Sequence, residues 1–424
     1  MSIIVKNGYV VNPIENTVEK LDIEIGNGKV RRLEKNINTK VEEIIDANGK
    51  YVLPGLVDIH AHFREPGYEY KETMKTGSRA ASAGGYTTVC VMANTNPVID
   101  NVKVLKELKE IIKKDSCINV LPIASATKGL EGKEITDIKG LQKNGAIAIS
   151  DDGKPIMDAE LLNEIIIKTD RLGIPLMIHS EDMRYVNNGC INKGKVSEKI
   201  GVRGIDRDAE NAMIERDLKL AKKLGCRIHI CHVSTKESVR MIRKAKKDGV
   251  KVTCEVAPHH FSITEDLIKE KGSLCKVNPP LRTKKDIEEI IEGIKDGTID
   301  AIATDHAPHS KEEKQLGLSK APFGISGIEL AFSITVTYLL KKGIINIVEL
   351  AKLMSFNPSS IIGINRGKLK AGNPADITIV DLNESFIVEE KDLFSKGKNT
   401  PFVGEKLTGK VKWTIVSGKI VYRG

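Results

Sequence analysis

The middle of the chain repeats one pattern: a short apolar segment, a turn of polar residues or glycine, and then an amphipathic helical segment. Eight of the apolar segments have the length and residue types of strands, namely Leu56–Phe63, Thr87–Asn94, Ile118–Ala126, Ala146–Asp152, Pro175–Glu181, Arg227–Ser234, Lys251–His260 and Asp300–His309. Helical periodicity separates them, for example in Asn101–Lys114, Asp158–Leu172, Asp206–Leu224 and Thr235–Lys247. Strands that alternate with helices form a parallel sheet, and eight such units close into a barrel. The sequence therefore predicts an α/β protein built on a (β/α)8 TIM barrel.

The two ends of the chain follow a different pattern. Both consist of short alternating segments separated by turn signals such as Asn7-Gly8 and Ser417-Gly418. Neither end holds enough strands for a stable sheet of its own. We therefore expect them to join in one small composite β-sandwich domain beside the barrel. The predicted division is 1–54 for the N-terminal part of this domain, 55–365 for the barrel and 366–424 for the C-terminal part.

Composition favours a soluble chain with a large core and excludes several classes of partner. Hydrophobic residues make up 40% of the sequence, but no apolar run approaches the roughly 20 residues that cross a bilayer. The net charge of +9 is spread along helical segments, and aromatic residues are 4%, so no basic patch with stacking aromatics indicates nucleic-acid binding. The N-terminus runs directly into a strand pattern without a cleavage site. We expect neither a membrane nor a nucleic acid as partner.

The seven cysteines are scattered and form no C-x-x-C pair. Scattered cysteines of this kind are typical of reduced thiols in a reducing compartment. The expected location is therefore cytoplasmic.

Side chains that bind metals stand at the ends of several predicted strands. His60 and His62 are two residues apart in a strand, so both imidazoles point to one face. Barrel topology would bring the ends of the other strands to the same mouth. The resulting ligand set is His60, His62, Asp152, His179, His232 and Asp305. Six ligands are too many for one tetrahedral zinc ion and suit two ions that share a bridging carboxylate. A closed structural zinc site is disfavoured because barrel mouths are open.

Side-chain parity selects among neighbouring candidates. In the eighth strand Ala301, Ala303 and Asp305 share one face, and small residues on the barrel interior would place Asp305 inside. The same rule favours Asp152 over Asp151. It separates His232 from His229, which we assign to the helix layer as a core histidine. By the same parity, His306 points away from the interior.

Two long motifs carry a resemblance to a known family. The run His60–Gly67, followed by Glu72-Thr73, resembles the first signature of the dihydroorotase family, and Ala303–His309 resembles the second. Pro322-Phe323-Gly324 resembles the loop that closes over the substrate. The segment Gly367–Asp376 resembles the return into the small β domain of cyclic amidohydrolases. The resemblance covers nearly the whole chain.

The resemblance implies a site with two divalent metal ions, with Zn²⁺ the first choice for these ligands and cobalt or manganese compatible with them. His60 and His62 would hold one ion together with Asp305, and His179 and His232 would hold the other. Asp152 would bridge the ions where many amidohydrolases use a carboxylated lysine. Lys154, two residues further along, remains the alternative bridge.

The resemblance also implies which residues bind the substrate. Arg64, Asn94 and His309 would grip its free carboxylate, since a guanidinium pairs with a carboxylate through two hydrogen bonds. The ring amide would contact Asn278, Phe323 and Gly324, with His62 beside it. For Arg64 the alternative is a salt bridge with Glu65 or Asp58. His259 and His260 are expected behind the site or in the core.

The activity implied is the reversible cyclisation of N-carbamoyl-L-aspartate to L-dihydroorotate in pyrimidine biosynthesis, with a hydroxide between two metal ions as nucleophile and Asp305 as general acid and base. Another ring-opening amidohydrolase, an allantoinase or a dihydropyrimidinase, is the first alternative. A barrel without activity that serves as a scaffold is the second. The pathway makes association with aspartate transcarbamoylase conceivable, although no sequence feature requires it.

Overall fold

Eight short parallel strands form a closed ring in the middle of the chain. The computed structural model describes residues 2–424. One half of the ring contains β6 (Leu56–Ala61), β7 (Tyr86–Val91), β8 (Asn119–Ala124) and β9 (Ala148–Ile149). The other half contains β10 (Met177–Ile178), β13 (Ile228–Ile230), β14 (Val252–Val256) and β15 (Ala301–Ile302). Parallel bridges from Ile149 to Leu176 and from Ala61 to His306 join the halves. The predicted (β/α)8 barrel is confirmed.

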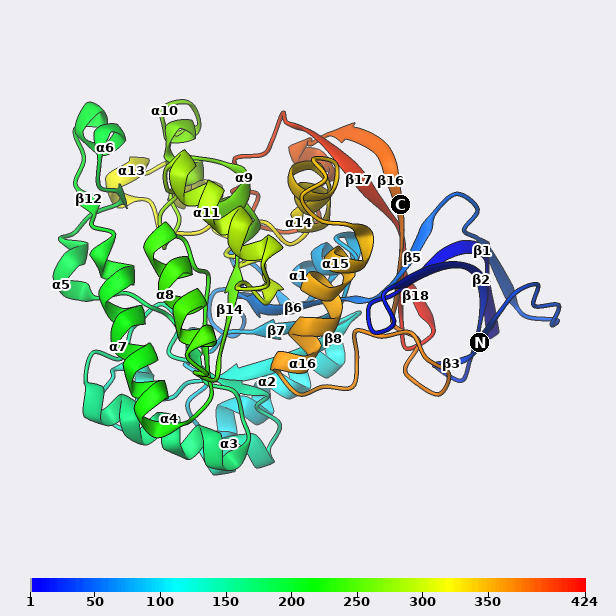
Figure 1. The fold of residues 1–424 in the computed structure, drawn as a ribbon, viewed down its shortest axis with the longest axis horizontal. Coiled ribbons are helices and arrows are strands. Elements are labelled where there is room, and N and C mark those ends of the chain that lie inside the picture. Colours follow the sequence, from blue (N-terminus) through cyan, green and yellow to red (C-terminus); the bar gives the residue numbers. More distant parts are fainter. Residues whose placement is uncertain (1) are drawn as a thin grey trace.

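Helices surround this ring (Figure 1). The longer ones are α1 (Met74–Ala83), α2 (Val102–Asp115), α4 (Ala159–Leu172), α7 (Asp208–Leu224), α8 (Lys236–Lys247) and α11 (Lys284–Lys295). Four of them begin at side chains that accept hydrogen bonds from the first turn, namely Thr73, Asn101, Asp158 and Thr235. Their apolar faces, including Leu105 and Ile165, are fully buried. The helices expected from periodicity are therefore present, with ends that differ by at most two residues.

Shorter elements complete the barrel and its loops. They are α3 (Ile138–Lys143), α5 (Met183–Val186), β11 (Ile191–Asn192), α6 (Lys195–Ile200), β12 (Gly204–Ile205), α9 (Pro258–Ser262), α10 (Ile268–Lys271), α12 (Lys311–Lys314), α13 (Gly317–Lys320), α14 (Ala331–Thr335), α15 (Ile347–Ala351) and α16 (Asn357–Ile361). Within residues 2–424, no helix has both the length and the hydropathy to span a bilayer.

In β9 and β15, small side chains face the interior of the barrel, as parity predicts. Ala148, Ala301 and Ala303 belong to the interior cluster, whereas Ile149 and Ile302 pack outward in the core shared with the helices. Because small side chains fill little of the interior, the strands can approach one another closely below the mouth of the barrel. This arrangement leaves room for a site at the mouth.

The chain ends build one sheet beside the barrel. It is formed by β1 (Ser2–Asn12), β2 (Thr17–Gly26), β3 (Lys29–Glu34), β4 (Glu43–Asp46), β5 (Tyr51–Pro54), β16 (Ile377–Ile387), β17 (Lys406–Val416) and β18 (Lys419–Arg423). The hydrogen-bonded order is β18-β17-β16-β5-β1-β2-β3, with β4 on β1. In Figure 1 the blue N-terminal and red C-terminal strands accordingly lie together. The composite β domain expected from the two ends is present.

Both faces of this sheet are buried near the barrel. Alternate residues of one strand point to opposite faces. Val52 of β5 belongs to the separate core of the sheet, whereas its neighbour Leu53 belongs to the core of the barrel. Val10 and Val11 of β1 divide in the same way. The sheet thus encloses a core of its own with one face and packs on the barrel with the other.

Candidate active site

The six predicted ligand residues meet at the carboxyl ends of the barrel strands. Asp152 stands at the centre: its Oδ1 lies 3.3 Å from His179 Nδ1 and 3.4 Å from both His60 Nε2 and His232 Nε2. Its Oδ2 lies 3.5 Å from His62 Nε2. Asp305 Oδ1 approaches His62 Nε2 to 3.2 Å and His60 Nε2 to 3.6 Å. All six side chains are buried.

The donor set and its unpaired atoms fit divalent metal ions. His60 Nε2 and Asp152 Oδ1 are buried and have no hydrogen-bond partner within residues 2–424. Two sets of three residues each bring their ligand atoms within 4.8 Å of one another. One set is His60, His62 and Asp305, and the other is His60, Asp152 and His232. Imidazole nitrogens and carboxylate oxygens at such spacing are typical zinc-type ligands. A buried polar atom without a partner is costly, and a cation would satisfy both of these atoms.

A second hydrogen bond orients three of these histidines. His60 Nδ1 donates to Glu255 Oε1 at 2.6 Å, and His62 Nδ1 donates to Asn94 Oδ1 at 2.9 Å. His179 Nε2 lies 3.2 Å from Glu181 Oε2. In each ring the other nitrogen therefore faces the site, which is the arrangement of metal-binding histidines.

Glu255 and Glu181 were not singled out from the sequence. Glu255 carries a visible signal, since it is a carboxylate inside the otherwise apolar end of β14, next to Val256. Glu181 follows His179 by two residues, in the segment just after β10.

The assignment of His229 to the helix layer is wrong. Its Nε2 lies 3.2 Å from Glu255 Oε2, and its Nδ1 lies 2.8 Å from Thr253 Oγ1. Both partners project into the barrel, as does Cys231, which shares the face of His229 and belongs to the interior cluster. His232 has the opposite parity and reaches the site because its φ of 34° turns the chain at the end of the strand. Below the site, Glu255 contacts His229 through one carboxylate oxygen and His60 through the other, and this buried chain of contacts holds His60 in place.

The buried carboxylates of the site are ionised. Burial alone would raise the pKa of Asp152, but His60, His179 and His232 hold it well below its ordinary value. Burial opposes ionisation of Asp305 as well, and His62 and His60 keep the pKa of its carboxyl low. Both side chains are therefore available as anionic ligands or proton acceptors.

Neighbouring candidates point elsewhere. Asp151 Oδ1 accepts the backbone N–H groups of Ala126 and Thr127 at 2.7 and 3.0 Å. Lys154 is exposed and does not line the site cavity. His306 Nε2 lies 3.4 Å from Glu72 Oε2, away from the ligands. His260 belongs to α9, and its Nε2 lies 2.9 Å from the Pro279 carbonyl oxygen.

A cavity of about 160 Å³ opens directly above the ligands. The predicted residues on its wall are His62, Arg64, Asn94, Asp152, His179, His232, Asn278, Asp305, Phe323 and Gly324. His60 lies beneath it and is fully buried. Metal-type ligands and polar substrate-type groups thus share one small space.

Arg64 presents an unpaired guanidinium to this cavity. Its Nε donates to the Pro308 carbonyl oxygen at 3.1 Å, and no carboxylate within residues 2–424 forms an ion pair with it. The two alternative partners are engaged elsewhere: Asp58 accepts from Thr304 N at 3.0 Å, and Glu65 accepts from Met74 N at 2.6 Å. Burial lowers the pKa of Arg64 without neutralising it. A guanidinium left without a counter-ion favours an anionic ligand.

His309 stands behind Arg64 as a neutral ring. Burial, reinforced by Arg64 and Lys71, lowers its pKa to about 2. Its Nε2 lies 2.8 Å from the Phe323 carbonyl oxygen and therefore carries the proton, while Nδ1 accepts from Lys71 Nζ at 3.3 Å. Arg64 Nη2, 3.2 Å from the same Nε2, consequently has no acceptor there. The Nη N–H groups of Arg64 therefore remain free for a ligand.

Solved structures with the same fold define the class of this protein. The L-hydantoinase (dihydropyrimidinase) from Arthrobacter aurescens superposes with a TM-score of 0.90 at 26% identity, covering 99% of this chain and 96% of the other. A dihydropyrimidinase from Brevibacillus agri has the same fold, with a TM-score of 0.87 at 21% identity over 100% of this chain and 95% of the other. Together with the histidine and aspartate cluster, this fold is that of a metal-dependent cyclic amidohydrolase.

Within that class, the chain belongs to the dihydroorotase family. A family model described as "Dihydro-orotase-like" matches residues 49–238. A dihydroorotase from Thermoanaerobacter sp. (strain X514) is 48% identical over 423 residues, covering 100% of this chain and 98% of the relative. A dihydroorotase from Acetivibrio thermocellus is 46% identical over 420 residues, covering 99% of both chains. The resemblance seen in the two sequence motifs is confirmed.

Proposed function

We propose that this protein is a dihydroorotase that interconverts N-carbamoyl-L-aspartate and L-dihydroorotate. The observation that carries the choice of substrate is the unpaired guanidinium of Arg64 on the cavity wall. Dihydroorotate bears a ring carboxylate, which dihydrouracil, hydantoin and allantoin lack. A site that holds an unpaired cation is suited to the charged substrate and is poorly satisfied by the neutral ones.

The proposed carboxylate-binding group consists of Arg64, Asn94 and His309. Arg64 offers its free Nη groups, and Asn94 borders the same cavity, with Nδ2 3.4 Å from the Asp152 carbonyl oxygen. His309 lies beside Arg64, with its ring nitrogens on the Phe323 carbonyl oxygen and Lys71 Nζ, and would join this group when its contact with Phe323 opens. On the opposite side of the ring, Asn278 and the backbone of Phe323 and Gly324 would meet the amide.

The proposed metal ligands are the six clustered side chains, with two ions, Zn²⁺ by preference, and Asp152 between them. His60, His62 and Asp305 would hold one ion, and His179 and His232 the other. Bound divalent ions would polarise the ring carbonyl and make a water molecule acidic enough to attack it near neutral pH.

Asp305 is the proposed general acid and base. In ring opening its ionised carboxylate takes a proton from the attacking water and delivers it to the ring nitrogen as the C–N bond breaks. In ring closure the protonated Asp305 gives its proton to the oxygen that departs from the distal carboxylate as hydroxide. The carbamoyl nitrogen attacks that carbon and passes one of its own protons to the Asp305 carboxylate.

The test is a direct assay of purified protein with L-dihydroorotate. Loss of ring absorbance should require divalent metal and stop with chelator, and allantoin, hydantoin and dihydrouracil should react at least about a thousandfold more slowly in kcat/KM. Faster turnover of a neutral ring would favour the alternative, an allantoinase or dihydropyrimidinase. Absence of turnover with every ring in the presence of bound metal would favour the scaffold alternative.

Two further elements of the proposal concern the cell. We propose a cytoplasmic location because all seven cysteines are free and six of them are buried. Association with aspartate transcarbamoylase, which would deliver the carbamoyl aspartate, is proposed from the pathway alone. Gel filtration of the two proteins together, compared with each alone, tests it.

A further inference from the structure

The loop that carries Phe323 and Gly324 is held from behind by two buried polar side chains. One is Lys314, at the end of α12, and the other is Asn399, from the segment that leads into β17. Each is only 3% exposed. Neither lines the candidate active-site cavity.

Lys314 uses all three of its ammonium protons on backbone carbonyls. Its Nζ lies 2.9 Å from the oxygen of Gly324, 3.0 Å from that of Pro322 and 3.2 Å from that of Lys276. No carboxylate within residues 2–424 pairs with this ammonium. A buried lysine without a counter-ion is unusual, and here three carbonyl dipoles take the place of the anion.

Asn399 connects this loop to the segment that follows Asp305. Its Nδ2 donates to the carbonyl oxygens of Gly324 and Ala307 at 2.9 and 3.1 Å, and its Oδ1 accepts from the backbone N–H of His309 at 2.8 Å. Both amide protons and the amide oxygen are therefore satisfied. The side chain fixes the distance between the two loops on that side of the cavity.

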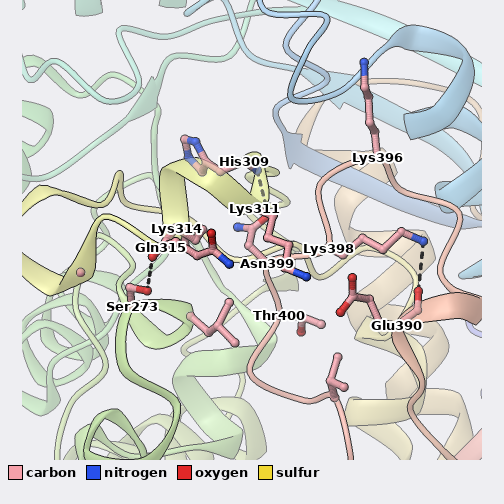
Figure 2. A pocket seen from close by; sticks show the side chains of 13 residues that line it. Ser273, His309, Lys311, Lys314, Gln315, Glu390, Lys396, Lys398, Asn399 and Thr400 are labelled. Atoms are coloured by element: carbon pink, nitrogen blue, oxygen red, sulfur yellow. Dashed lines mark hydrogen bonds between the residues drawn. The ribbon is translucent and has the colours of Figure 1, made fainter.

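A second, larger cavity of about 480 Å³ lies on the other side of these residues. Lys314, Asn399 and His309 border it (Figure 2), and all three contact residues that line the candidate active site. They are thus the wall between the two cavities. From the side of this second cavity, both Lys314 and Asn399 form hydrogen bonds to the Gly324 carbonyl oxygen of the loop.

We propose that Lys314 and Asn399 are positioning residues that set the Pro322–Gly324 loop against the Asp305–His309 segment and thereby determine substrate affinity. The proposal rests on the proposed function, since it assigns substrate contacts to Phe323 and Gly324. Loss of either side chain should leave the metal ligands and Asp305 in place while the loop shifts. The consequence is a rise in KM that is larger than the fall in kcat.

The kinetic test compares Lys314→Met and Asn399→Ala with Lys311→Met. Lys311 lies on the same helix and is exposed, so its variant is a matched control for a lost cation on α12. The first two variants should raise KM for dihydroorotate about tenfold or more, with kcat within about threefold and unchanged metal content. Lys311→Met should match the wild type. A KM within about twofold of wild type in both test variants, or an equal rise in Lys311→Met, would overturn the proposal.

Amide hydrogen exchange gives a second measurement that does not depend on activity. Without substrate, peptides that contain residues 318–326 should exchange faster in Lys314→Met than in wild type, and peptides from β6 and β15 should not. Equal exchange in this loop would contradict the proposal. If Lys314→Met does not fold, Asn399→Ala is measured in the same two ways and decides. A wild-type protein that lacks activity with dihydroorotate but shows the exchange difference would refute the proposed function and not the role of the two residues.

Discussion

Asp152 Oδ1 is the atom on which the candidate site converges. Nitrogens of His60, His179 and His232 surround it, and the second oxygen of the same carboxylate faces His62. One oxygen of this carboxylate faces three of the candidate histidines and the other faces the fourth, and this is the basis for proposing Asp152 as the bridge between two ions. A short aspartate can occupy this place because the β9 segment brings its backbone close to the ligands.

The first prediction concerns this bridge. Asp152→Ala should lose at least one metal equivalent and nearly all activity, because several buried imidazoles would lose their shared anionic partner. Metal analysis and the dihydroorotate assay measure both. Lys154→Ala is the control and should behave as wild type, since Lys154 is exposed. Activity that disappears on removal of carbon dioxide and returns with bicarbonate would instead indicate a carboxylated lysine.

The second prediction concerns Arg64. Arg64→Met should cost about 3 kcal/mol or more of transition-state binding for dihydroorotate, because a two-bond guanidinium–carboxylate contact is lost. Both metals should remain bound, since Arg64 contacts none of the proposed ligands through its guanidinium. Measuring kcat/KM for dihydroorotate and dihydrouracil on both proteins tests this. Hydrolysis of dihydroorotate within about threefold of wild type would refute the proposed carboxylate contact.

The third prediction concerns pH and the two directions of the reaction. His62 and His60 hold the pKa of Asp305 low, so its carboxylate is ionised and ready to act as a base in ring opening. Ring closure requires the same group protonated. The unit expected to titrate near neutral pH is the metal-bound water together with Asp305, so from roughly pH 6 to pH 9 hydrolysis should speed up and cyclisation should slow down, with midpoints that belong to the whole metal site and not to one residue. Initial rates in both directions test it, and parallel profiles would contradict this path of the proton.

At the scale of the element, parity predicted much of the barrel and failed where strands end. It placed Ala148, Ala301 and Ala303 inside, as the structure does. It misplaced His229 because the rule assumed that the strand continues to His232. The ladder of β13 ends at Ile230, and the left-handed backbone at His232 then turns the side chain inward. The rule that alternate residues point to opposite faces holds only where the strand is hydrogen-bonded to its neighbours.

The positions of the candidate metal ligands were therefore easier to predict from the sequence than the positions of the residues that hold these ligands in place. Histidines and aspartates at strand ends are visible in the sequence because topology alone brings those ends together. Glu255 and Asn399 are different, because each makes its contact across a large separation in the chain, with His60 and with Gly324. Contacts of that kind depend on distances between loops, which no local pattern encodes.

The fourth prediction concerns Gly324. Its φ is 144°, and an added Cβ would lie 2.6 Å from the Ala307 carbonyl oxygen. Gly324→Ala should therefore displace the loop and raise KM for dihydroorotate about tenfold or more. Gly327→Ala is the matched control, since its nearest neighbour would be 3.8 Å away. Steady-state kinetics of both variants decide, and an unchanged KM in Gly324→Ala would show that the loop does not need this close approach.

At the scale of the whole molecule, the C-terminal half reaches back over the barrel mouth. Glu329, just before α14, accepts the backbone N–H groups of Phe394 and Ser395 at 2.7 and 2.9 Å. Lys396 donates through its backbone N–H to Glu72 at 3.2 Å. The segment then delivers Asn399 to the site. The β domain and the catalytic mouth are therefore coupled through one connecting stretch of chain.

The fifth prediction uses the titration of Glu329. Burial raises its pKa from 4.5 to about 7, so the protonated form is favoured in the folded protein. Its contribution to the free energy of unfolding is fully present below about pH 4.5 and is lost as the pH rises through about 7. Relative to Glu329→Gln, the wild type should be more stable at about pH 5 than at about pH 8. Urea unfolding at both pH values measures the difference, and a pH-independent difference would contradict the assignment.

The sequence also predicted that the two chain ends share a domain, because neither end has enough strands alone. It did not predict how they interleave. The order of strands depends on which edges are left uncovered once the barrel has formed, and β5, a strand of only four residues, joins the two sets.

That position of β5 has a consequence for the order of events on the ribosome. β5 pairs with β1 on one side and with β16 on the other, and Ile377 and Ile415 close the core that Ile3 and Ile25 begin. The strands from β1 to β5 therefore keep an open edge and an incomplete core until residues 377–416 have left the exit tunnel. An unprotected edge is prone to pair with other chains. During synthesis the barrel can close first, and the sheet that contains β1 and β5 is completed only afterwards.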